Sequence, residues 1–172
     1  MARPRKIPAA PRAALALALV VAAPLSAAPV DGEAYQDWVT RCEPIGEDES
    51  AKQCFIVQNL VLKEKNQRVM LIAVAYPPEQ PDPVAVLTLP LGISLPPGVR
   101  LRVDDGEVHR LAVDRCLATG CKAGFILSGQ LLQAFKAGLK AEVTIHDGGR
   151  QPITLPVSLR GFTAALRSLQ SD

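Results

Sequence analysis

The residues of this chain that could carry out acid–base or metal chemistry are few, and its two histidines come first. His109 and His146 each fall in a stretch with the alternation of a β-strand. Neutral imidazole is a common metal ligand, and a carboxylate such as Asp114 or Asp147 could complete a site if the fold brought these groups together. Histidines this far apart in sequence are more often unrelated surface residues. A metal-binding or enzymatic protein that uses them is therefore our second hypothesis.

Other patterns typical of catalysis or ion binding are missing from the sequence. Ser94, Ser128 and Ser158 do not stand in the Gly-x-Ser-x-Gly context of a nucleophile elbow. The acidic residues between the first two cysteines lack the order of a calcium-binding loop, which needs oxygens at alternate positions and a central glycine. These acidic residues are Glu43, Glu47, Asp48 and Glu49. We predict no catalytic residue, no cofactor, no metal ligand and no enzymatic activity.

Four cysteines, Cys42, Cys54, Cys116 and Cys121, allow three pairings. In an oxidising compartment, an even number of cysteines indicates disulfides. We favour the local bridges Cys42–Cys54 and Cys116–Cys121, because each closes a short loop between extended segments. Chain entropy alone would favour long-range pairing, so the connectivity stays open at this point. A zinc site or a redox-active pair is disfavoured, because neither spacing is that of a zinc knuckle or a Cys-x-x-Cys motif.

The N-terminus has the three zones of a secretory signal peptide. A basic start is followed by an apolar run from Ala13 to Ala23 and by small residues around Ala27. As a helix this run would be about 17 Å long, too short for a hydrocarbon core of about 30 Å. We expect residues 1–27 to be a cleaved signal peptide and residues 28–172 to be the mature domain. The protein would then be periplasmic, secreted or at the cell surface, with no stable membrane span after cleavage.

Loss of residues 1–27 would change the sign of the net charge. The whole chain has 19 basic and 17 acidic residues, and four of the basic ones precede the expected cleavage site. The remaining 15 basic and 17 acidic residues give a net charge of −2, and the basic residues are scattered along the sequence. Nucleic-acid binders instead cluster positive charge on one face or along one helix. We exclude nucleic acid as a partner, and the length fits a single domain.

Short apolar stretches separated by proline and glycine dominate the mature region. They predict a mainly β protein, built as an antiparallel sandwich or a partly closed barrel. Asp105-Gly106 indicates a hairpin turn, because glycine readily takes a positive φ. The expected strands are Trp38–Arg41, Cys54–Leu62, Val69–Tyr76, Val84–Leu89, Val99–Val103, Val108–Val113, Ala123–Leu127, Ala141–His146 and Ile153–Val157.

Two stretches with helical spacing interrupt the strands, and we expect both to form short helices against the sheets. The first begins after Ser128, a candidate N-cap, and ends at Gly138, while the second runs from about Gly161 to the C-terminus. A lone tryptophan near a disulfide is more often a core residue than a partner-binding anchor, so we place Trp38 in the core. The apolar residues on shared helix faces are Leu131, Leu132 and Phe135, then Phe162, Leu166 and Leu169.

Three segments of the mature region carry a family resemblance. They are PLGISLPPGV at residues 90–99, CLATGCKA at residues 116–123 and ITLPVSLRGFTAAL at residues 153–166. Trp38, Cys42 and Cys54 precede them in the same order. Together these residues resemble the invasion-associated locus B family over nearly the whole mature chain.

The resemblance implies a small β-sandwich-like envelope protein. The family consists of exported proteins of proteobacteria, chiefly alphaproteobacteria, and takes its name from a role in host-cell invasion. The resemblance carries over no catalytic residue, because the shared positions are glycine, proline, cysteine and apolar residues. We therefore expect a non-enzymatic binding or interaction module with a role in host-cell association or envelope function. Its partner would be an envelope or host protein that the sequence does not identify, and the sequence leaves the oligomeric state open.

Overall fold

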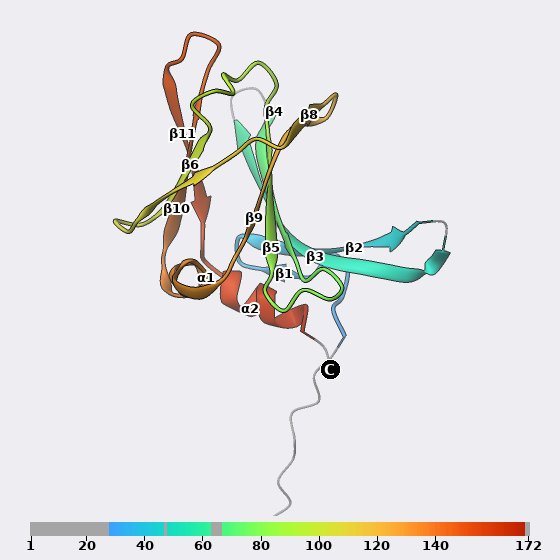
Figure 1. Ribbon diagram of the computed structural model, residues 1–172. Coiled ribbons are helices and arrows are strands. Elements are labelled where there is room, and N and C mark those ends of the chain that lie inside the picture. The colour runs from blue at the N-terminus through green and yellow to red at the C-terminus, as the bar shows by residue number, and fades with distance from the viewer. Residues whose placement is uncertain (1–27, 47, 63–66, 171–172) are drawn as a thin grey trace, which may run out of the picture.

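Two antiparallel β-sheets pack against each other as a sandwich in the computed structural model of the protein (Figure 1). The structure describes residues 28–46, 48–62 and 67–170, so the expected signal peptide, residues 1–27, lies outside the described residues. The prediction of a mainly β protein with two short helices is confirmed. Because the strands form two separate sheets, the architecture is the sandwich and not the partly closed barrel.

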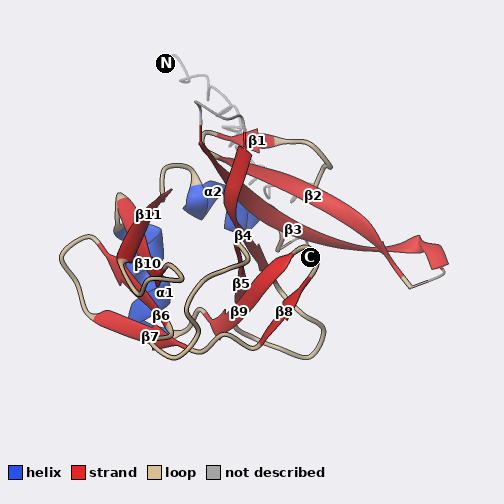
Figure 2. Cartoon of the chain, turned by 90° about the horizontal axis from the view of Figure 1, so that it is seen from above, coloured by secondary structure: helices blue, strands red, loops and turns tan. Residues whose placement is uncertain are grey.

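The larger sheet has seven strands. In spatial order they are β1 (Ala34–Tyr35), β2 (Trp38–Ile45), β3 (Asp48–Leu62), β4 (Gln67–Ala75), β5 (Val84–Leu89), β9 (Gly120–Ile126) and β8 (Arg115–Leu117). The smaller sheet has four strands, in the order β11 (Pro152–Ser158), β10 (Lys140–His146), β6 (Val99–Val103) and β7 (Val108–Leu111). Helices α1 (Gly129–Ala137) and α2 (Phe162–Ser168) close one end of the sandwich, as Figure 2 shows from above.

The β2–β3 hairpin is longer than the sequence pattern indicates. Trp38 and Thr40 are buried, but from Arg41 onward β2 leaves the core, and the hairpin projects from the sandwich as an arm (Figures 1 and 2). An exposed ladder needs no apolar alternation, so the polar stretch that begins at Asp48 has no strand signature in the sequence. Strands β1 and β8 were missed for a similar reason, because both are short and neither contributes a buried residue.

The β6–β7 turn and the start of α1 lie where the sequence predicts them, but one detail of each prediction was wrong. The turn between β6 and β7 forms where Asp105-Gly106 predicts it, but the residue with positive φ is Asp104 (φ 44°) and not Gly106. The amide of Gly106 donates to the carbonyl of Val103 at 2.8 Å. Ser128 is the N-cap residue of α1, yet its side chain makes no capping hydrogen bond. Helix α1 therefore depends on burial of Phe135, not on its cap.

A chain of four aromatic rings links both helices to the seven-stranded sheet. Trp38 of β2 meets Phe162 of α2 edge-on with ring centroids 5.2 Å apart, and Phe162 meets Phe135 of α1 at 5.3 Å. Phe135 in turn lies 6.4 Å from Phe125 of β9. Edge-to-face contacts of this kind stabilise beyond the area they bury. The first three rings are fully buried, so Trp38 is a core residue as expected.

Both disulfides join residues that stand directly opposite each other in antiparallel pairs. Cys42 of β2 pairs with Cys54 of β3, and Cys116 of β8 pairs with Cys121 of β9. These are the two local bridges that we favoured, and no free cysteine occurs in the part of the chain that the structure describes. The first bridge crosses the base of the arm, and the second holds the edge strand β8 against β9.

Gly161, at the start of α2, sits where no side chain fits. Its φ is +84°, and a Cβ atom there would overlap the carbonyl oxygen of Tyr35 in β1. Only glycine adopts this conformation at no cost while allowing another backbone to approach so closely. The entry of α2 is therefore tied to β1.

We expect Gly161→Ala to lower the free energy of unfolding by about 3 kcal/mol, from backbone strain and steric overlap together. The matched control is Gly92→Ala, because Gly92 has a similar φ of +81° with no atom within 4 Å of the added methyl group. Its cost should be about 1 kcal/mol, from the backbone alone. Urea denaturation measures both values, and equal losses in the two variants would contradict the assigned contact with Tyr35.

Candidate functional site

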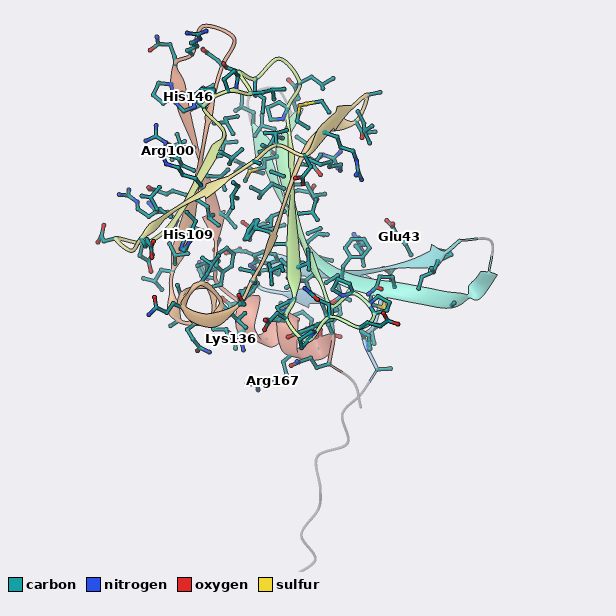
Figure 3. All side chains as sticks on the ribbon, viewed as in Figure 1. Glu43, Arg100, His109, Lys136, His146 and Arg167 are labelled. Carbon is teal, nitrogen blue, oxygen red and sulfur yellow. A yellow bond between two sulfur atoms is a disulfide. The ribbon has the colours of Figure 1, made fainter. Side chains whose placement is uncertain are left out.

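The two histidines do not share a site. His109 lies on β7 level with Leu101 and Val143, whereas His146 is three residues further along β10, and β6 separates the two strands. Strand geometry places their Cα atoms about 10 Å apart along the strands and about 10 Å apart across them, or roughly 14 Å in total. Alternation also puts their side chains on opposite faces of the sheet. Figure 3 shows the same separation.

The carboxylates that could have joined the histidines bind backbone amides instead. Asp114 accepts a hydrogen bond from the amide of Gly124 at 2.8 Å, and Asp147 accepts one from Gln151 at 2.8 Å. Within the described residues, no group of three or more histidine, cysteine or acidic side chains is placed to hold a metal ion. The second hypothesis, a metal or enzymatic site built on both histidines, is not supported.

Asp104 also has structural partners, and part of the acidic cluster lies outside the described side chains. Asp104 accepts hydrogen bonds from the amides of Leu139 (3.1 Å) and Lys140 (3.0 Å), which ties the β6–β7 turn to the start of β10. Of the acidic cluster, Glu43 lies on the arm (Figure 3). Glu47 and the side chains of Asp48 and Glu49 lie outside the described part of the structure.

The two sheets are joined by directional hydrogen bonds at one seam, where β11 meets β3. Gln58 of β3 binds the backbone of Ser158 as a neighbouring strand would: its Oε1 accepts from the Ser158 amide at 2.8 Å and its Nε2 donates to the Ser158 carbonyl at 2.9 Å. The buried indole of Trp38 donates to the same carbonyl at 2.9 Å. The hydroxyl of Ser158 donates to Asp37 at 2.6 Å, so this serine is part of the seam and not a free nucleophile.

A groove of about 530 Å³ opens beside this seam. Its polar lining comes from the seam and its apolar lining from leucine and proline side chains. Leu139 at its rim is 75% exposed, more than any other large apolar side chain among the described residues. The lining residues are Asp37, Gln58, Asn59, Leu60, Leu139, Lys140, Pro156 and Ser158.

Prolines protect most of the β11 edge from pairing with another strand. The amide of Ser158 points to Gln58, away from β10, so Pro152, Thr154 and Pro156 present their backbone to the same free edge. Proline has no amide hydrogen, and only Thr154 offers a donor there. Of these three residues, Pro156 lines the groove, and its outward carbonyl is an acceptor there.

Charged side chains on the outer face of the smaller sheet form a compact network. Glu142 accepts from Arg102 at 2.7 Å and from Lys140 at 2.8 Å. The hydrogen bond from Lys140, and next that from Arg102, lower the pKa of Glu142. The Glu142 carboxylate is consequently ionised at neutral pH.

Away from this network, partial burial and, less strongly, the charge of Asp82 raise the pKa of Tyr76.

The sequence analysis placed Trp38 in the core and set Ser158 aside as a nucleophile, but it predicted neither the seam nor the groove. Gln58 and Ser158 are 100 residues apart, and an isolated glutamine in a strand carries no local signal.

Among residues 28–46, 48–62 and 67–170, no helix is long and apolar enough to cross a membrane.

The fold and the seam define a small β-sandwich protein with two cross-strand disulfides. The model of the family described as invasion associated locus B (IalB) protein matches residues 38–170. The chain belongs to this family.

Relatives and a solved structure agree with this assignment. Over 140 residues, the chain is 31% identical to an invasion protein B homolog of Brucella abortus, covering 81% of this chain and 79% of the relative. It is 29% identical over 143 residues to invasion protein B of Bartonella bacilliformis, covering 81% and 74%. The crystal structure of invasion associated protein B from Bartonella henselae superimposes with a TM-score of 0.68 at 29% identity, covering 80% of this chain and 92% of that one.

We expect Gln58→Ala to lower the free energy of unfolding by about 2 kcal/mol, because it leaves the amide of Ser158 without its partner at the seam. Asn59→Ala removes an exposed side chain from the next position and should change stability by less than about 0.5 kcal/mol. Denaturant midpoints measure both variants. The seam would lose its assigned role if Gln58→Ala were as stable as Asn59→Ala.

Proposed function

We propose that the mature protein acts outside the cytoplasm as a non-enzymatic interaction module of the cell envelope, and that the groove beside the seam receives a segment of a protein partner. The observation that carries the proposal is the groove itself, which combines the exposed Leu139 with the outward backbone carbonyl of Pro156. The relatives support it as well, since they are named invasion proteins and not enzymes. In this proposal, the role of the protein is to associate with a host cell or with another envelope protein.

The chemistry of the groove suits an extended polypeptide. Leu60 and Leu139 can contact one apolar side chain of a partner, while Asn59 can donate to or accept from its backbone. The outward carbonyls of Thr154 and Pro156 add acceptors along the β11 edge. Since that edge offers only one amide donor, side-chain contacts in the groove must supply most of the specificity.

The disulfides and the N-terminal sequence together support this location. Two cross-strand disulfides form and persist in oxidising compartments. The basic, apolar and small-residue zones of residues 1–27 supply a route to such a compartment.

We expect protein isolated from its native envelope to have lost residues 1–27 and to contain no alkylatable thiol before reduction. Intact mass measured with and without reduction checks both points, because reduction should expose four sites for alkylation. A retained N-terminus or thiols that react before reduction would contradict export and the proposed location.

Photo-cross-linking in intact cells tests the groove. A photoreactive phenylalanine analogue at Leu139 or at Asn59 should give the same adduct, because both residues line the groove. The control position is Ile126 of β9, a 49% exposed apolar residue that does not line the groove. Blotting and mass spectrometry identify the adducts. Absence of a shared adduct, or the same adduct from Ile126, would argue against the groove as the binding site.

A further inference from the structure

The outer face of the four-stranded sheet aligns two arginines and two threonines in one row. On β6, β10 and β11 the odd-numbered residues are mostly buried and the even-numbered residues face outward. The registers pair Thr154 with Thr144, Thr144 with Arg100, and Arg100 with Arg110. These four side chains therefore run side by side across the sheet, and Figure 3 shows Arg100 on its outer side.

The two arginines are close neighbours because of the type of pair they form. The amide and carbonyl of Ser158 point away from β10, and this direction reverses from each residue of a strand to the next. Strand by strand, it therefore determines which opposite residues exchange backbone hydrogen bonds. By this alternation Thr144 and Arg100 form a hydrogen-bonded pair, and Arg100 and Arg110 form a non-hydrogen-bonded pair. Cα atoms in pairs of the latter kind are only about 4.5 Å apart, which brings the side chains closer together.

Among the described side chains, neither arginine of this pair has an acidic partner like the one that binds the neighbouring Arg102. Arg102 binds Glu142, but within the described residues no carboxylate lies within 4.0 Å of the guanidinium of Arg100 or Arg110. Like charges directly opposite each other in a sheet are unfavourable. The mature chain carries a net charge of −2 by sequence, so this local concentration of positive charge is not a consequence of general basicity.

A recess of about 230 Å³ lies at the row, lined by Arg100, Arg102, Val108, Glu142, Thr144 and Thr154. The hydroxyl oxygens of the two threonines are 3.2 Å apart, and each can donate or accept. Guanidinium groups match the geometry of a phosphate oxyanion with two parallel hydrogen bonds. Arg100 therefore brings an unpaired positive charge to the recess beside the threonine hydroxyls. Arg110 stands opposite Arg100 in the register, outside this lining, and the charge of Glu142 is balanced by Arg102 and Lys140.

We propose that this row is a binding site for a phosphomonoester, held by Arg100 and Arg110 and contacted by Thr144 and Thr154. A phosphomonoester carries close to two negative charges at neutral pH, which matches two unpaired guanidinium groups. A polynucleotide would need a longer basic track and aromatic platforms, and the row has neither. The site uses none of the seam residues and goes beyond the function proposed for the groove.

The test titrates the mature, oxidised protein with glucose 6-phosphate at constant ionic strength, followed by calorimetry, with glucose as the uncharged control. In parallel, vesicles containing phosphatidic acid present a phosphomonoester on a lipid, and vesicles containing phosphatidylglycerol present a phosphodiester. We expect binding to glucose 6-phosphate or to phosphatidic acid, and only weak binding to glucose and phosphatidylglycerol. The arm that binds distinguishes a soluble ligand from a lipid headgroup.

Matched variants separate the site from general electrostatics. Arg100→Gln and Arg110→Gln should each weaken binding about tenfold or more. Arg167→Gln removes the same charge from α2, at the other end of the molecule, and should change binding less than about twofold (Figure 3). Because all three arginines are exposed, circular dichroism should show folded variants. Binding to neither ligand, equal binding to phosphodiester vesicles, or an equal loss in Arg167→Gln would overturn the proposal.

Discussion

The position of the two sheets relative to each other depends on the hydrogen bonds that Ser158 accepts and donates at the seam. Apolar contact between sheets is not directional and would permit some sliding. The indole of Trp38 is fully buried and needs an acceptor, and the amide of Gln58 binds both polar groups of the same backbone unit. These bonds fix one point of contact between the sheets, and the aromatic rings of α1 and α2 fill the space beside it.

This fixed point also determines which surfaces are available outside. The groove exists because β11 meets β3 only near Ser158, which leaves the rest of the β11 edge unpaired. The arginine row lies further along the face of the same sheet, beyond the network centred on Glu142. The row is thus built on the four-stranded sheet alone, whereas the groove is shared with β3 of the seven-stranded sheet, which carries both disulfides.

Local patterns in the sequence were sufficient for the parts of the fold that depend on burial. Alternation located β6 at Val99–Val103 without error and β10 to within one residue, because both strands bury every second side chain. It missed the outer half of the β2–β3 hairpin, where no side-chain pattern is needed to form a ladder. The Gln58–Ser158 contact and the facing of Arg100 and Arg110 depend on strand register and sheet packing, which a single sequence does not encode locally. The same reasoning could not decide whether His109 and His146 met, and they do not.

The disulfide at the base of the arm has a mechanical consequence. If a protease cut the arm between the two cysteines, a force that pulled the new ends apart would open the β2–β3 ladder one hydrogen bond at a time until it reached Cys42 and Cys54. Separation would stop there, because the covalent bond carries the load in place of the next pair in the ladder. The buried segment from Trp38 to Thr40 lies on the protected side. The arm can therefore be cut by a protease between the two cysteines while the two strands stay joined and the core stays closed.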